Sequence, residues 1–260
     1  MMSAAWTSLR QFTQARIAQG HSGCGLPTQA MLDFQLAHAQ ARDAVWQNWQ
    51  SAGLAAELAD QGWESLQLET QVINRAQFLQ RPDLGRCLSQ QSIEAVQAYS
   101  AAEFDLVIVL SNGLSSPALD QHGLGLLVEI VAAYQAMGLK IAPICLLANA
   151  RVAVADQIGA LLNTRLAVMV IGERPGLSAA DSLGIYFSYQ PNITHTDAER
   201  NCLSNIRPPA GLSYAAAAAK LAYLSQMAIQ LGYSGVALKD DMPSSLISHE
   251  TPLGLSADVD

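Results

Sequence analysis

An acidic and a basic residue stand together in the turn Gly172-Glu173-Arg174-Pro175-Gly176, directly after the apolar run 166–171. Such an unbroken run is typical of a strand buried on both faces of a parallel sheet, and glycine with proline ends it. Ligands of open α/β sheets bind beyond the carboxyl ends of the strands, so Glu173 and Arg174 stand where a ligand is expected. The alternative is a turn whose charged side chains are simply solvated.

Two other patterns resemble binding motifs but lack the necessary context. Residues 120–125 (DQHGLG) match D-x-H-x-x-G, in which a histidine replaces a cobalamin's own base on cobalt. That histidine belongs directly after the first strand, whereas here the strand is expected to end at Leu110, so a histidine on the surface of the next helix is the default for His122. Residues 23–28 (GCGLPT) break the dinucleotide pattern at its last position and follow no strand. The remaining histidines form no spaced metal-binding cluster.

The composition narrows the class of partner. The chain has 260 residues, 50% of them hydrophobic, only 14% of them charged, and a net charge of −8. This charge argues against nucleic acid or an anionic membrane surface as partner. The low charge content favours a surface that is partly covered by a partner, and an alanine-rich interior accounts for part of it. No secretory signal or transmembrane span is expected. The four cysteines form no C-x-x-C pair, so reduced cytosolic thiols are expected and a zinc site or disulfide framework is not.

Residues 1–103 are predicted to form a smaller, mainly helical N-terminal domain. Thr28 is expected to cap a helix over 29–50, and a second helix is expected over 92–99. The alternating stretch 66–72 suggests a lone strand pair.

From residue 104 strands alternate with helices, which predicts a Rossmann-like α/β domain over 104–238 with a parallel sheet and helices on both faces. Residues 239–260 show no periodicity and are expected to form a loose tail. Thr196 and Glu199 form a capping box for the third expected helix. The strands are expected at 104–110, 139–147, 165–171 and 185–189, and the helices at 117–137, 155–162, 197–205 and 213–231.

Six segments, in order and with plausible spacing, resemble the small (light) subunit of adenosylcobalamin-dependent ethanolamine ammonia-lyase. The resemblance covers nearly all of residues 8–232. The segments are GLPTQAMLDFQLAHAQARDAVW (25–46), RPDLGRCL (81–88), VIVLSNGLSSPAL (107–119), RVAVADQIG (151–159), GERPGL (172–177) and TDAERNCLSNI (196–206).

The resemblance implies that Val152, Glu173 and Cys202 contact adenosylcobalamin, each just beyond a strand. It also implies a heavy (large) subunit that binds ethanolamine, with the cobalamin at the interface and a radical reaction that yields acetaldehyde and ammonia. The family keeps the nucleotide base on cobalt, so no metal ligand is expected from this chain, and no catalytic residue is assigned to it. The enzyme is expected in the cytoplasm, and its enclosure in a bacterial microcompartment stays open.

Two alternatives from other classes remain. A noncatalytic assembly protein would bind a partner without cobalamin. An NAD-dependent oxidoreductase would need a glycine-rich turn after the first strand, where Ser111-Asn112-Gly113-Leu114 stands instead.

Overall fold

Six strands form one mixed sheet, in the order β1-β3-β2-β4-β5-β6, in the computed structural model, which describes residues 8–243. Neighbouring strands from β1 to β4 run parallel, whereas β5 is antiparallel to β4 and β6 is antiparallel to β5. The predicted α/β class is therefore confirmed. The strands are β1 (Ser65–Glu69), β2 (Leu106–Ser111), β3 (Ile144–Ala148), β4 (Leu166–Gly172), β5 (Leu183–Tyr189) and β6 (Asn201–Ile206).

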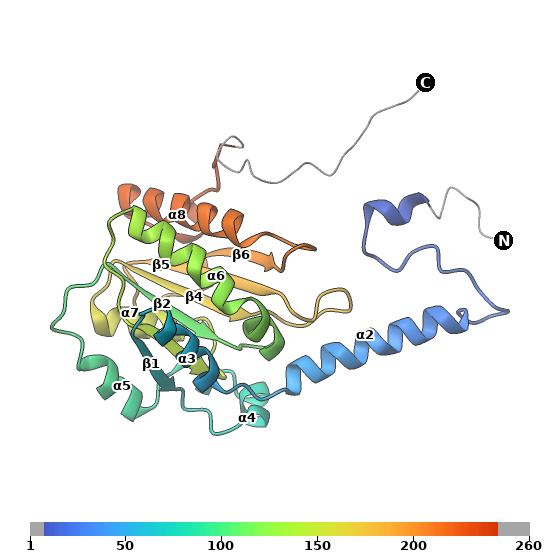
Figure 1. Ribbon diagram of the computed structural model, residues 1–260, viewed down its shortest axis with the longest axis horizontal. Helices are drawn as coiled ribbons and strands as arrows, with labels where there is room; N and C mark the ends of the chain where they lie inside the picture. The colour runs from blue at the N-terminus through green and yellow to red at the C-terminus, as the bar shows by residue number, and fades with distance from the viewer. Residues whose placement is uncertain (1–7, 244–260) are drawn as a thin grey trace.

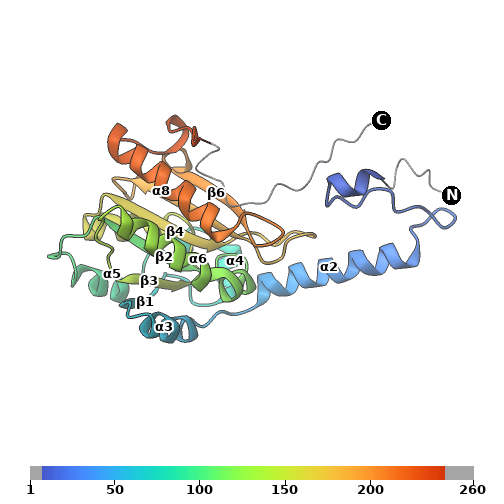
Figure 2. The same cartoon turned by 45° about the horizontal axis from the view of Figure 1, so that its top comes forward.

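Helices cover both faces of this sheet, as Figures 1 and 2 show. One face carries α3 (Ser51–Asp60), α6 (Ser116–Ala136) and α8 (Tyr214–Leu231), and the other carries α5 (Gln90–Gln97) and α7 (Val154–Leu162). Ser115 and Ser213 cap α6 and α8 with their side chains, and Gly232 ends α8 in the left-handed conformation. Within residues 8–243 no helix is both long and apolar enough to cross a membrane. The remaining helices are α2 (Thr28–Trp46), α4 (Arg75–Gln80) and the short 3₁₀ turns η1 (Leu9–Phe12), η2 (Leu84–Arg86), η3 (Asp197–Glu199) and η4 (Gly235–Ala237).

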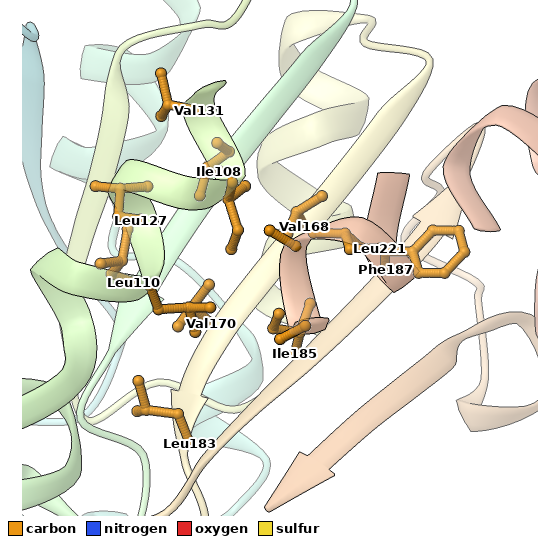
Figure 3. Packing of buried hydrophobic residues seen from close by; sticks show 14 of the residues in the cluster. Ile108, Leu110, Leu127, Val131, Val168, Val170, Leu183, Ile185, Phe187 and Leu221 are labelled. Atoms are coloured by element: carbon orange, nitrogen blue, oxygen red, sulfur yellow. The ribbon is translucent and has the colours of Figure 1, made fainter. Parts of the chain in front are cut away.

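The central strands are buried on both faces because successive side chains point to opposite sides. Ile108 and Leu110 pack with α6 and α8, as Figure 3 shows, whereas Val107 and Val109 pack with α5 and α7. All four side chains are fully buried. This explains why the apolar runs in the sequence are continuous rather than alternating.

The sequence-based expectation of a wholly parallel sheet is wrong at β5 and β6. The linker between β4 and β5 contains no helix, and its turn is closed by a hydrogen bond of 2.7 Å from Gly176 N to Ala179 O. A parallel return needs a crossover of a dozen or more residues, usually a helix, so this short linker brings β5 back antiparallel. The Rossmann-like classification stays a prediction.

The helix expected over 197–205 is also wrong. The predicted capping box of Thr196 and Glu199 is present, but it closes only the single turn η3, and the chain then enters β6. Leu203 and Ile206 are buried in the core while Cys202, Ser204 and Asn205 are exposed, so β6 is covered on one face. The two buried residues are three positions apart because the pairing of β6 with β5 contains a register shift between them.

The N-terminal part differs from expectation in two details. The helix α2 begins at Thr28 itself, with Pro27 in the capping position and no side-chain cap, and it ends at Trp46. The stretch around 66–72 is not a lone pair, because β1 pairs with β3 in the main sheet. The division at residue 103 stays a prediction, and most of the expected tail, 244–260, lies outside the described residues.

Candidate functional site

Polar side chains tie together the loops that follow β2 and β3 at the carboxyl edge of the sheet. Ser111 Oγ accepts hydrogen bonds of 3.2 Å from the backbone N–H groups of Gly113 and Ala150. Asn112 Oδ1 accepts from Asn149 N at 2.8 Å. Ser111 and Asn112 are fully buried, so their polar atoms must be satisfied inside the protein. The two loops are therefore fixed relative to each other before any ligand binds.

The loops that follow β2 and β4 touch through their backbones, and glycine makes this approach possible. A Cβ atom on Gly172 would lie 2.2 Å from Ser115 O and 2.3 Å from Asn112 O. Gly113 has a φ of +46°, and a Cβ there would lie 2.4 Å from Ile171 Cγ1. No other residue fits either position without moving a loop.

Two arginines flank the buried ring of Phe78 in α4. The guanidinium carbon of Arg75 lies 4.9 Å from the ring centroid, and that of Arg151 lies 4.2 Å from it. Arg75 donates to Gly113 O at 2.7 Å and to Asn149 Oδ1 at 2.8 Å. Arg151 donates from Nη2 to Phe78 O at 3.1 Å. Cation–π contact and these hydrogen bonds thus hold two positive charges next to the rim, which is formed by the loops that follow β2, β3 and β4 at the carboxyl edge of the sheet.

Glu173, the first residue after β4, is held by β6. Its carboxylate accepts a short hydrogen bond of 2.5 Å from Ser204 Oγ and one of 3.1 Å from Asn205 N. Asn205 has a left-handed φ of 60°. Each carboxylate oxygen retains a free lone pair, so Glu173 can still accept from a ligand N–H group.

Cys202 lies within β6, opposite Tyr186 of β5, and not beyond a carboxyl end as the sequence suggested. The residue is exposed, yet the surrounding atoms partly desolvate the thiol and raise its pKa, and the charge of Glu173 raises it further. Desolvation also raises the pKa of Tyr186. Both groups therefore stay protonated at neutral pH and can donate hydrogen bonds.

Two adjoining cavities open along this edge and over the uncovered face of β5 and β6. The smaller, about 430 Å³, is lined by Val152, Glu173 and Ser204 together with Phe78 and Ile171. The larger, about 750 Å³, is lined by the 193–200 segment and residues near η2. Arg151, Val152 and Tyr186 line both cavities.

A buried ion pair fixes the 193–200 segment that closes the larger cavity. Arg200 Nε donates to Asp156 Oδ2 at 2.7 Å, and both side chains are at most 5% exposed. Ser188 Oγ donates to Asp156 Oδ1 at 2.5 Å, and His195 Nδ1 lies 3.6 Å from the same oxygen. Because the two charges neutralise each other, this cluster positions the wall rather than adding charge to it.

His122 does not lie at this rim. It stands inside α6, as expected, but it is buried and not on the helix surface. Its Nδ1 is hydrogen bonded to the Tyr214 hydroxyl at 2.7 Å, and its Nε2 lies 3.7 Å from Asp181. These contacts assign His122 a packing role between α6 and α8. Among residues 8–243 no group of three or more His, Cys, Asp or Glu side chains could hold a metal ion.

The structure brings the three sequence-predicted contact residues to one region. Val152 and Glu173 line the same cavity, and Cys202 is the cross-strand neighbour of Tyr186, which lines it too. The sequence did not single out several residues of the same rim, namely Arg75, Phe78, Arg151, Tyr186 and Ser204. Of these, only Tyr186 and Ser204 carried a usable signal, because polar groups that alternate with buried apolar residues mark the open face of a strand pair.

Comparison with known proteins agrees with the resemblance seen in the sequence. The family profile "Ethanolamine ammonia-lyase light chain" matches residues 3–239. An ethanolamine ammonia-lyase small subunit from Pseudomonas fluorescens is 50% identical over 239 residues, which cover 91% of this chain and 87% of the relative. One from Pseudomonas putida is 50% identical over 248 residues, 94% of this chain and 91% of the relative. One from Pseudomonas syringae pv. tomato is 47% identical over 239 residues, 91% and 83% of the two chains. The chain therefore belongs to the ethanolamine ammonia-lyase light-chain family.

Proposed function

We propose that this chain is the small subunit of an adenosylcobalamin-dependent ethanolamine ammonia-lyase and that the rim around Val152, Glu173 and Cys202 holds the coenzyme. The observation that carries the proposal is that Val152 and Glu173 line one cavity at the carboxyl edge of the sheet, and that Cys202 is the cross-strand neighbour of Tyr186, which lines this cavity and the adjoining one. When bound, the coenzyme supplies the radical chemistry that converts ethanolamine to acetaldehyde and ammonia. The chain's own residues bind the coenzyme, orient it and exclude water.

The residues of the rim fit the chemistry of a cobalamin, which is a large apolar disc fringed by amides and carrying one phosphate. Glu173 can accept from amide N–H groups, and Ser204 and Tyr186 offer hydroxyl groups. Val152 and Ile171 supply apolar contact in the same cavity. The buried Nη2 of Arg75 and Nε of Arg151 have no hydrogen-bond partner within residues 8–243. Each of these guanidinium groups therefore has an N–H group that the described residues leave unsatisfied.

The proposal includes a large subunit that supplies the substrate site and contacts α2. Apolar side chains are exposed along this helix: Leu36 is 60% exposed and Trp46 is 54% exposed. The second half of α2 also lines a cavity of about 480 Å³ together with Arg151 and Arg174 of the rim. A partner that covers α2 would therefore reach the candidate coenzyme site as well.

Activity of the assembled pair tests the proposed reaction. The chain is purified with its large subunit, adenosylcobalamin and ethanolamine are added, and acetaldehyde is measured. Product formation that depends on both subunits and on the coenzyme is expected. A well-folded complex that binds the coenzyme but forms no acetaldehyde would contradict the assignment to this reaction.

Coenzyme retention tests the role of Glu173. Glu173→Ala removes an acceptor and releases Ser204 and Asn205, so we expect cobalamin affinity of the complex to fall about tenfold, which corresponds to about 1.4 kcal/mol. The measurement is a titration of the corrin absorbance. Glu129→Ala, which removes an equal charge from an exposed position in α6, is the control and should leave affinity unchanged. Equal affinities of the two variants would remove Glu173 from the site.

A further inference from the structure

Four arginines at the rim lack an ionic partner. Arg75, Arg86, Arg151 and Arg174 have no carboxylate oxygen within 4.0 Å in the part of the chain that the structure describes, whereas Arg200 and Arg207 at neighbouring positions are paired with aspartates. Unpaired cations are unexpected in a chain with a net charge of −8. This chain's own carboxylates therefore leave the positive charge of the four arginines without a contacting counter-ion.

The four cations are close enough to repel one another. The pKa of Arg151 is lowered by burial and by the charges of Arg86 and Arg174. Burial lowers the pKa of Arg75 to about 10, and the charge of Arg151 contributes. Arg75 is only 4% exposed, and its Nη2 atom is buried without a partner. Such a cluster is destabilising by itself unless an anion binds to it.

The cluster opens onto the cavities of the candidate site. Arg151 lines both cavities that adjoin Val152, Arg86 lines the larger one, and Arg174 lines the smaller one. Arg86 and Arg174 are exposed, so their guanidinium groups are free to turn toward a ligand. Arg75 lies behind them as a fixed charge. Arg200 also lines the larger cavity, but its ion pairs with Asp156 and Asp197 neutralise its charge.

We infer that Arg86, Arg151 and Arg174 form an anion subsite that binds the phosphodiester of the cobalamin's nucleotide tail, with Arg75 as the buried charge behind it. The inference rests on the proposed function. A phosphate is the one anionic group of this coenzyme, and arginine binds phosphate oxygens with paired N–H groups. The three arginines lie in three different loops, around η2 and after β3 and β4, so the anion would also hold these loops together.

The test compares two corrinoids that differ by one phosphate, cobinamide and cobinamide phosphate. Affinities of the assembled complex for each are measured by corrin absorbance. Wild type should bind the phosphate form about tenfold or more tightly. Arg174→Gln and Arg86→Gln, made separately at exposed positions where folding is not at risk, should each bring this ratio closer to one. Arg165→Gln removes an equal charge from the start of the β4 segment, at the opposite edge, and should keep the wild-type ratio.

The possible failures are distinct. A wild-type ratio near one, or variants that weaken both corrinoids equally, would overturn the phosphate subsite and leave the proposed function standing. Loss of assembly in the two rim variants but not in Arg165→Gln would assign the arginines to the large subunit and also overturn the inference. A wild-type complex that binds neither these two corrinoids nor adenosylcobalamin would remove the proposed coenzyme role, and the subsite with it.

Discussion

Glu173 differs from a solvated turn residue because both of its carboxylate oxygens are engaged. Ser204 and Asn205 hold it from β6, and the side chain also lies against Gly184, where a Cβ atom would be 3.0 Å from Oε1. The solvated-turn alternative is therefore wrong for Glu173, although its neighbour Arg174 is exposed. A carboxylate held in this way presents its remaining lone pairs in a fixed direction, which favours selective binding.

The charge of Glu173 should be measurable through the reactivity of Cys202. Since this charge raises the pKa of the thiol, Glu173→Gln should lower that pKa and increase the thiolate fraction at pH 8. Alkylation of Cys202 by iodoacetamide should become several-fold faster, because only the thiolate reacts. Peptide mass spectrometry separates this signal from that of Cys24, which is also exposed and serves as the internal control. A rate at Cys202 that rises no more than the rate at Cys24 would contradict the electrostatic contact.

At the residue scale, the sequence predicts Glu173 but not Arg75. Glu173 follows an apolar run and precedes Pro175 and Gly176, so local context alone places it at a sheet edge. Arg75 is positioned by Val45 O, Gly113 O and Asn149 Oδ1, which are 30, 38 and 74 residues away along the chain. No local pattern encodes partners that only the fold brings together.

At the element scale, periodicity predicts the strands β2, β4 and β5 and the helices α6 to α8 within two residues, because their apolar faces are long. The strand expected at 139–147 begins only at Ile144, in β3. Periodicity and capping signals fail where they predict a longer element than the one that forms. The capping box at Thr196 is real, but β6 begins to pair with β5 five residues later, at Asn201. Strand direction was not predictable from periodicity either, because side chains point to opposite faces with the same two-residue period in parallel and antiparallel strands.

The glycine contact between the β2 and β4 loops gives an element-scale prediction. Gly172→Ala should destabilise the fold by about 3 kcal/mol, because the new methyl group meets the backbone atoms Ser115 O and Asn112 O and a loop must move. Gly176→Ala, in the same turn, is the matched control: its Cβ would meet only Ala179 O at 3.7 Å. This change should stay within about 0.5 kcal/mol. Denaturant unfolding gives both free energies, and equal values would contradict the close packing.

At the scale of the whole molecule, α2 extends away from the sheet, as Figure 1 shows. Of its residues only Ala44 is buried. The segment before it touches the rest of the chain through Arg16, which donates to Leu177 O at 3.2 Å and lies 5.9 Å from the Phe34 ring centroid. A helix with so little cover in the single chain is expected to gain its stability from assembly.

A charge on α2 should therefore impair assembly with the large subunit. Leu36→Glu would place a carboxylate where an apolar contact is proposed, and co-purification of the large subunit should fall at least about tenfold, a loss of roughly 1.5–3 kcal/mol. Val236→Glu is the control, since Val236 is 69% exposed and belongs to η4 and not to α2. Equal yields of complex from both variants would show that α2 is not part of the contact.

The antiparallel return of β5 and β6 also decides when the rim can form during synthesis. The N–H group that holds Glu173 belongs to Asn205, 32 positions later in the chain. At about 5–20 residues per second, a ribosome needs roughly two to six seconds to add that interval. Until then Glu173 has neither of its β6 donors. In a nascent chain stopped before β6, the turn would form without the hydrogen bonds from Ser204 and Asn205 that hold the carboxylate. A ligand that needs the anchored glutamate can bind at this rim only after β6 has been synthesised and has paired with β5.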